Sequence, residues 1–191
     1  MHAAVCAAFG ASCAALSENK TEVIISSPVS YRHRLAPGMW DTVSCSIAFA
    51  DLYVDVSPPR TFWEQAHAVW QQLLEWMKDQ KLFGSWSAIE AASQAERDDS
   101  QFLHRARRDM KSYDLSISNL GRQPIPGRCG DLTIEAIHSA ACVPGEIVVN
   151  LCVLGGTMYI TLATRGLSRT TNNAARQMVA SALTRLSMLP P

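Results

Sequence analysis

The segment from Ile147 to Ala163 constrains the fold more than any other part of the chain. It consists of two β-type runs, apolar on both faces, joined by Gly155-Gly156. Adjacent glycines predict a tight hairpin, because the central positions of such a turn take positive φ, which glycine adopts without steric cost. A strand that is apolar on both faces needs cover on both sides. We therefore expect cover on each side of the apolar residues Val148, Val149, Leu151, Val153, Leu154, Met158, Ile160 and Leu162.

The rest of the chain alternates between strand-like and helix-like patterns. β-Branched or alternating runs predict four further strands, over Glu22 to Val29, Val43 to Val56, Tyr113 to Asn119 and Leu132 to Ala141. Helical patterns cover Ala3 to Leu16, Thr61 to about Gln80, and a closing segment that begins at Thr170 or Thr171. This order is not a regular βαβ alternation. It predicts an α/β (α+β) two-layer sandwich, in which helices pack on an open mixed β-sheet within a single domain, residues 1–191.

The helix that begins at Thr61 has the strongest local signal. Thr61 and Glu64 form a T-x-x-E capping box, in which each side chain satisfies a backbone N–H that the first helical turn leaves without a partner. Apolar residues then recur at helical spacing and predict one buried face, made of Phe62, Ala66, Val69, Trp70, Leu73 and Met77.

Composition excludes several classes of partner. The 17 basic and 17 acidic side chains cancel, so the chain has no general attraction for nucleic acid or an anionic membrane. No apolar run approaches the roughly 20 residues that span a bilayer. The apolar first sixteen residues lack the positive leader of a secretory signal, which favours a buried helix in a cytoplasmic protein. A small molecule or another protein is the expected partner.

The sequence contains no recognisable catalytic or metal motif. The six cysteines form no C-x-x-C pair, so we expect neither a metal site nor a cofactor, and buried free thiols are favoured over disulfides. No G-x-S-x-G, P-loop or G-x-G-x-x-G occurs. None of the five histidines, His2, His33, His67, His104 and His138, is followed by Asp at the fourth place.

Three ordered segments carry a family resemblance: S-S-P-V-S-Y-R-H-R-L from Ser26, T-F-W-E-Q-A from Thr61 and Y-D-L-S-I-S-N-L-G from Tyr113. In order and spacing they resemble the C-terminal half of condensation-type acyltransferases. This superfamily includes chloramphenicol acetyltransferase and condensation domains, and the resemblance is greatest to alcohol O-acetyltransferases and polyketide-associated acyltransferases. The catalytic H-H-x-x-x-D-G of the N-terminal half is missing, so the chain resembles half an enzyme.

The resemblance implies two halves with a substrate tunnel between them. Ser118, Asn119 and Gly121 would lie at the tunnel wall, although a turn that only ends the strand is an equal alternative. Arg32 and Arg34 would contact an acyl-CoA or pantetheine donor or its carrier protein; the alternative is an arginine salt bridge that fixes the geometry between the two halves. The hairpin from Ile147 to Ala163 would cross to the other half. No catalytic residue can be assigned, because no position matches the histidine motif.

Three functions are consistent with these patterns. The first is O-acyl transfer in secondary metabolism, from acyl-CoA or a carrier-protein thioester to an alcohol or amine acceptor. It requires an N-terminal half chain as partner, and without that half the protein would self-associate. The second is a catalytically inactive binding module derived from the same fold. The third is an unrelated mixed α/β protein.

Overall fold

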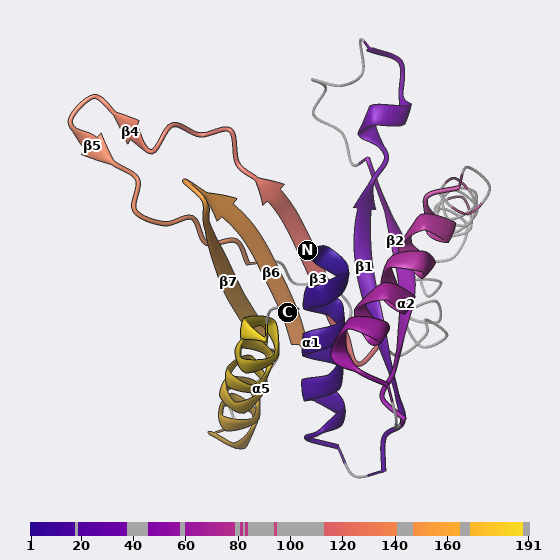
Figure 1. Ribbon diagram of the computed structural model, residues 1–191. Helices are drawn as coiled ribbons and strands as arrows, with labels where there is room; N and C mark the ends of the chain where they lie inside the picture. The colour runs from indigo at the N-terminus through magenta and orange to yellow at the C-terminus, as the bar shows by residue number, and fades with distance from the viewer. Residues whose placement is uncertain are drawn as a thin grey trace.

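In the computed structural model, the helices pack on one five-stranded mixed sheet (Figure 1). The structure describes residues 1–17, 19–37, 46–57, 60–78, 81, 83, 94, 113–140, 147–164 and 169–188. The sheet has the order β2–β1–β3–β6–β7. Its strands are β1 (Glu22–Ser30), β2 (Ile47–Asp55), β3 (Leu115–Arg122), β6 (Ile147–Leu154) and β7 (Thr157–Thr164).

Strand pairing makes the sheet mixed. β1–β2 and β6–β7 are antiparallel, whereas β3 lies parallel to both β1 and β6. The Gly155-Gly156 turn joins β6 to β7 with φ values of 58° and 85°, so the predicted hairpin and its backbone requirement are confirmed. The hairpin runs within the sheet, with β6 inside and β7 at an edge of the described sheet.

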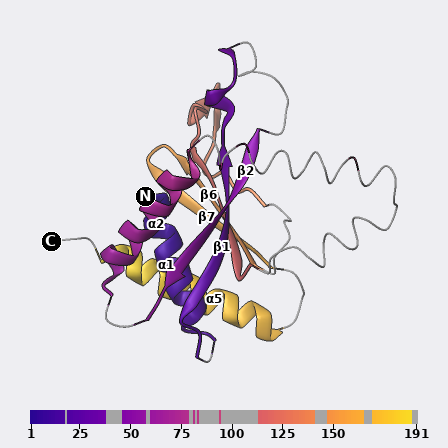
Figure 2. The ribbon, with the colours of Figure 1, turned by 90° about the vertical axis from the view of Figure 1, so that its right-hand side faces the viewer.

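The helices α1 (His2–Ala14), α2 (Phe62–Trp76) and α5 (Arg169–Ser187) cover one face of the sheet (Figure 2). α1 lies between the other two, because its small residues allow close approach on every side. A Cβ on Gly10 would come within 2.8 Å of the Val54 side chain on β2. The predicted α+β architecture is therefore confirmed, and its core lies between α1 and the sheet, where Phe9, Ile25, Leu52, Leu115, Ile117, Leu151 and Met178 are fully buried.

The capping box at Thr61 is formed as predicted. Thr61 Oγ1 accepts the Glu64 N–H at 3.3 Å, and Glu64 Oε2 accepts the Thr61 N–H at 2.7 Å. α2 then packs on α1 and β2, and its Gln72 side chain bonds both the N–H and the carbonyl of Tyr53 on edge strand β2. A side chain thus occupies backbone groups that would otherwise remain open at the edge of the sheet.

The predicted strand from Leu132 to Ala141 is wrong. Only Leu132–Thr133 is a strand (β5), and it pairs with β4 (Arg128–Cys129) in a separate arm that projects beyond the sheet (Figure 1). Residues 134–140 form an irregular segment over β6 and β7 instead. Side chains of those strands hold it there: Cys152 Sγ donates to the Ile137 carbonyl, and His138 Nδ1 lies 3.2 Å from Thr161 Oγ1.

Candidate functional site

The candidate site lies where β1 and β3 diverge. The even-numbered residues of β1 direct their backbone groups toward β3, since both the N–H and the carbonyl of Ile24 bond Asp114. Pro28 is also an even-numbered residue of β1, but proline has no backbone N–H to donate toward β3. The parallel pairing accordingly covers only Ile25 with Leu115 and Ser26 with Ser116, and the strands then separate.

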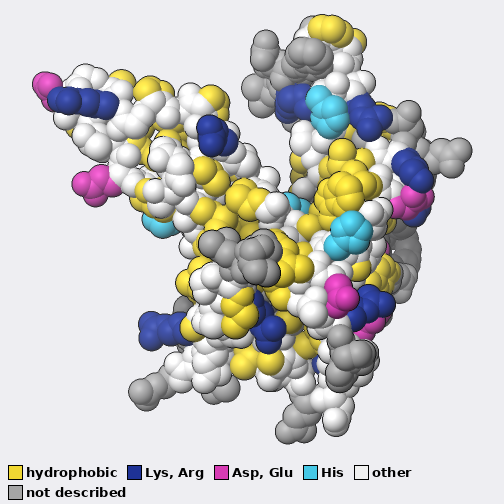
Figure 3. Space-filling view, in the orientation of Figure 1, with side chains coloured by type: hydrophobic (Ala, Val, Ile, Leu, Met, Phe, Trp, Pro, Cys, Tyr) yellow, Lys and Arg dark blue, Asp and Glu magenta, His cyan; other side chains and the backbone are white. Residues whose placement is uncertain are grey.

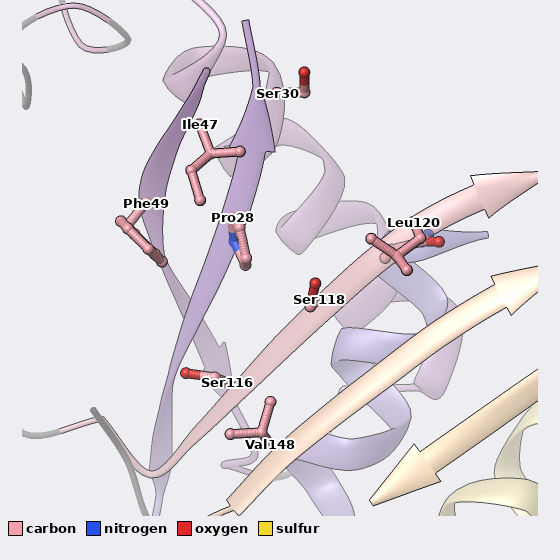
Figure 4. Close-up of a pocket in the computed structure, with 9 residues that line it drawn as sticks. Pro28, Ser30, Ile47, Phe49, Ser116, Ser118, Leu120 and Val148 are labelled. Carbon is pink, nitrogen blue, oxygen red and sulfur yellow. The ribbon is translucent and has the colours of Figure 1, made fainter. Parts of the chain in front are cut away.

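The divergence leaves an apolar cavity of about 370 Å³ on the sheet face opposite the helices (Figure 4). Four strands of the sheet contribute to its wall. Its lining residues are Pro28, Ser30, Ile47, Phe49, Ser116, Ser118, Asn119, Leu120 and Val148. None of these side chains titrates, so the cavity offers apolar contact and neutral hydrogen bonds.

A second hollow, of about 290 Å³, lies at the same divergence on the helix face. α2 contributes Trp70, Leu73 and Leu74 to its wall, Met77 follows at the C-terminal cap of α2, and α1 contributes His2. Pro28, Ser30 and Asn119 line both hollows, which places the two at one gap between β1 and β3. Hydrophobic side chains gather over α2 on this face, where Trp63 and Trp70 are 41% and 46% exposed (Figure 3).

A histidine–serine pair lies against the second hollow. His2 Nε2 is 2.8 Å from Ser27 Oγ, and Ser27 Oγ also donates to the Ile117 carbonyl at 3.3 Å. Burial, together with the positive charge of the Met1 amino group, lowers the pKa of His2 from 6.5 to about 4. His2 is therefore neutral at pH 7. Its Nδ1 is buried and has no hydrogen-bond partner among the described residues.

The structure brings two of the three predicted tunnel residues into the site. Ser118 and Asn119 line the cavity, and Asn119 lines the second hollow as well. Gly121 lies two residues beyond, at φ 67°, where the β3–β6 register shifts. Asn119 Oδ1 accepts the Gly121 N–H at 2.9 Å, which fixes the amide and leaves Asn119 Nδ2 as its donor group. Gly121 thus shapes the bulge that holds Asn119, and a Cβ on it would meet nothing within 4 Å.

The predicted donor-contact arginines follow β1, in a short 3₁₀ turn, Arg32–Arg34. Arg34 Nη2 donates to the Met77 carbonyl at 3.0 Å. This bond satisfies a carbonyl at the C-terminal end of α2, where positive charge also complements the helix dipole. Arg34 therefore helps to attach the end of β1 to α2, beside the second hollow.

Sequence patterns did not single out Ser116, Phe49 or His2 as site residues. Ser116 and Phe49 face the cavity only because β1 is paired with β2 on one side and β3 on the other. A sequence signal was nevertheless present for Ser116: apolar and polar residues alternate along Leu115–Ser118. Within the described ranges, no group of three or more His, Cys, Asp or Glu could hold a metal ion. No helix in those ranges is long and apolar enough to cross a membrane.

Comparison with known proteins shows similarity at the level of the fold. The epimerization domain from the third module of tyrocidine synthetase B matches with a TM-score of 0.65 and 12% identity, over 98% of this chain and 42% of that one. A condensation domain that mediates chain release from the enacyloxin polyketide synthase matches with a TM-score of 0.63 and 13% identity, over 99% of this chain and 36% of that one. The PapA2 acyl transferase matches with a TM-score of 0.57 and 11% identity, over 97% of this chain and 38% of that one.

The chain therefore has the fold of one part of the condensation-domain and acyltransferase architecture. It spans about two fifths of the length of these solved structures. No family model matches the sequence, and no curated protein does. The predicted half-domain fold is confirmed.

Proposed function

We propose that this chain is the C-terminal half of a condensation-type acyltransferase. The cavity beside the β1–β3 divergence carries the proposal, because it holds Ser118 and Asn119 on the strand that resembles the tunnel wall of that family. In this proposal residues 1–191 act as a single domain, and a partner half supplies the general base that removes a proton from the acceptor.

The proposed reaction is O-acyl transfer from acyl-CoA or a carrier-protein thioester to an alcohol or amine, in cytoplasmic secondary metabolism. The pantetheine thioester is a co-substrate and not a bound cofactor. An apolar wall suits the acyl chain or an apolar acceptor, and exclusion of water there strengthens the hydrogen bonds that position the reacting groups. Arg32, at the end of β1, is the proposed contact for the negative charges of the donor, and Arg34 holds that segment against α2.

Co-expression with the polypeptide encoded immediately upstream tests the proposal. We expect a stable complex that contains an H-H-x-x-x-D-G segment and releases free thiol from acetyl-CoA when an alcohol is added. Asn119→Leu should reduce turnover at least tenfold without dissociating the complex, whereas Ser187→Ala, on the exposed end of α5, should not. A complex that turns over equally well with Asn119→Leu would contradict the assignment of the tunnel wall.

The second candidate is a catalytically inactive binding module. The chemistry of the cavity favours it, because the described lining contains no titratable side chain. The two candidates predict different results in the same experiment. A complex with the H-H-x-x-x-D-G chain that binds substrate without turnover would favour the binding module.

A further inference from the structure

α2 carries a second apolar stripe, apart from the face that packs on α1 and β2. Trp63, His67, Trp70 and Leu74 follow one another at intervals of four, three and four residues. These are the intervals between the a and d positions of a coiled coil. Trp63, Trp70 and Leu74 are 41%, 46% and 40% exposed, and hydrophobic side chains gather over this helix in Figure 3. We call these four residues the α2 seam.

The α2 seam is not needed to hold the helix on its own domain. The helix already buries Gln65, Ala66 and Val69 against the rest of the chain, and one apolar stripe is enough to attach a surface helix. Large exposed side chains at coiled-coil spacing fit a second helix, because each of them inserts between side chains of the facing helix. Exposed apolar patches often mark sites of protein interaction. The α2 seam is therefore a surface for another helix.

An ordered series of polar residues flanks the α2 seam. Glu64, Gln71 and Lys78 are exposed and occur at intervals of seven residues, so they occupy the same flanking position of successive heptads. On the other flank, Ala66 and Leu73 are turned toward the core of the chain. A partner helix can therefore meet the polar flank only. Along α2 the charges of this flank are negative, neutral and positive.

We propose that α2 pairs antiparallel with α2 of a second copy of this chain, about a two-fold axis at Gln71. In such a pair the two polar flanks lie side by side and run in opposite directions, and every contact occurs twice. Glu64 then faces Lys78 of the second copy, and Trp70 packs against Leu74 of the second copy. A series that reads negative, neutral and positive is complementary to itself only when it is reversed. The charge order of α2 therefore selects a copy of this chain as the occupant.

The flanking side chains can make these contacts. Glu64 uses Oε2 in the capping box, and its other oxygen can accept from a lysine. Lys78 forms an ion pair with Glu75 on the same helix, but its side chain is 67% exposed, and such surface pairs are weak enough to exchange. Gln71 Nε2 lies 3.3 Å from His67 Nε2, and the Gln71 carbonyl oxygen can accept from its counterpart across the axis.

The dimer is the state of this chain without a partner half. α2 is one of the apolar surfaces that such a half would cover, so a second copy and a partner half would compete for it. The inference itself depends on the surface of one helix and requires neither acyl transfer nor a bound substrate.

Sedimentation equilibrium of the full chain tests the dimer. We expect a reversible equilibrium between monomer and dimer. Leu74→Lys should raise the dissociation constant about tenfold or more, because two leucines leave the interface of each dimer and two charges enter it. Leu183→Lys is the matched control: Leu183 is 46% exposed on α5, and its replacement should leave the constant unchanged. Circular dichroism verifies that each variant is folded.

Charge reversal tests the antiparallel orientation. Lys78→Glu should raise the dissociation constant about threefold to tenfold, because it sets a second carboxylate against Glu64 of the other copy. Arg176→Glu makes the same change of charge on exposed α5 surface and should have no effect. Adding Glu64→Gln to Lys78→Glu keeps the capping box and should recover most of the affinity. The two positions are about 21 Å apart along one helix, so this recovery reports a contact between two chains.

Four results would overturn the proposal. These are a monomeric unmodified chain, equal weakening by Leu74→Lys and Leu183→Lys, a Lys78→Glu variant that dimerises as tightly as the unmodified chain, and a weakened Lys78→Glu variant that Glu64→Gln does not restore. None of these measurements involves acyl transfer, so the proposed function succeeds or fails separately.

Discussion

At the scale of single residues, His2 shows how burial sets chemistry at the site. Its ring is hydrogen-bonded to Ser27 between α1 and β1, and burial lowers its pKa to about 4. A protonated imidazole there would be a charge with little solvent around it. Protonation of His2 at low pH should therefore destabilise the packing of α1 beside the second hollow.

The pH dependence of stability tests this account of His2. The folded-state pKa lies below the unfolded value of 6.5, so the unfolded chain binds the proton more readily. Stability from His2 is full above pH 6.5 and falls as the pH drops toward 4. Between pH 7 and pH 5 the expected loss is at most about 2 kcal/mol. Urea unfolding of the unmodified chain and His2→Gln at both values measures it. Equal pH dependence in the two proteins would contradict the account, because carboxylates are common to both.

At the scale of elements, specific contacts position α1 and α2 against β2. α1 approaches β2 at Gly10, where only hydrogen fits against Val54. α2 is started by its capping box and then attached to β2 through Gln72 and through Trp76, whose Nε1 donates to the Asp51 carbonyl at 3.0 Å. A small residue and a few polar side chains thus define the spacing of the two layers.

Gly10→Ala tests the close approach of α1. The added methyl would overlap the Val54 side chain, and such overpacking costs about 1–3 kcal/mol in spite of the better helix propensity of alanine. Chemical denaturation measures the loss. Gly127→Ala is the matched control, because a Cβ there meets nothing within 4 Å. An unchanged or higher stability of Gly10→Ala would show that the layers can separate at little cost.

Thr61→Ala tests the capping box. The substitution removes the acceptor for the Glu64 N–H and should destabilise the protein by about 1 kcal/mol. Thr184→Ala, on the exposed surface of α5, loses only a bond to the carbonyl four residues back and should be close to neutral. If both variants unfold at the same denaturant concentration, the capping box contributes nothing to stability.

At the scale of the whole molecule, the arrangement is that of about two fifths of a larger protein. Apolar side chains remain exposed on α2, and the β4–β5 arm carries Leu132 at 73% exposure away from the sheet. The hairpin from Ile147 to Ala163, which was expected to cross to another half, runs within the sheet, whereas the arm projects beyond the sheet (Figure 1). The exposed side of α2 and the arm are both surfaces that the proposed partner half would cover.

The isolated chain should transfer no acetyl group from acetyl-CoA to alcohols or amines. A missing general base alone costs on the order of a hundredfold to ten-thousandfold in rate. Thiol release in the presence of each acceptor measures the reaction. Turnover that is lost in His33→Ala or in His2→Gln would show that this chain supplies its own base.

The isolated chain should also self-associate, because its exposed apolar surfaces lack a partner. Size-exclusion chromatography with light scattering, and binding of a hydrophobic dye, measure this. Addition of the H-H-x-x-x-D-G chain should convert the oligomers into a defined complex. A soluble monomer that binds no dye would argue against the half-enzyme proposal.

Much of the fold could be predicted from local patterns. The Gly155-Gly156 hairpin, the Thr61 capping box and the strand of β1 depend on residues close in sequence, and all three are confirmed. The strand predicted from Leu132 to Ala141 is wrong. Its alternating pattern is a local signal, but a strand forms only where another strand is available to pair with it. β3 and β6 pair with each other, and the intervening segment is held over the sheet by side chains of β6 and β7.

The sequence by itself determined the helices and the strands of the main sheet, their order, and the resemblance that placed Ser118 and Asn119 in the site. Only the tertiary structure decided what faces the cavity. Pro28 interrupts pairing with a strand almost ninety residues later, and Ser116 and Val148 become neighbours across two strands of the same sheet. The physical reason is that a polar residue in an alternating strand can face solvent, a cavity or a core. The choice is set by strands that are distant in sequence and adjacent in space.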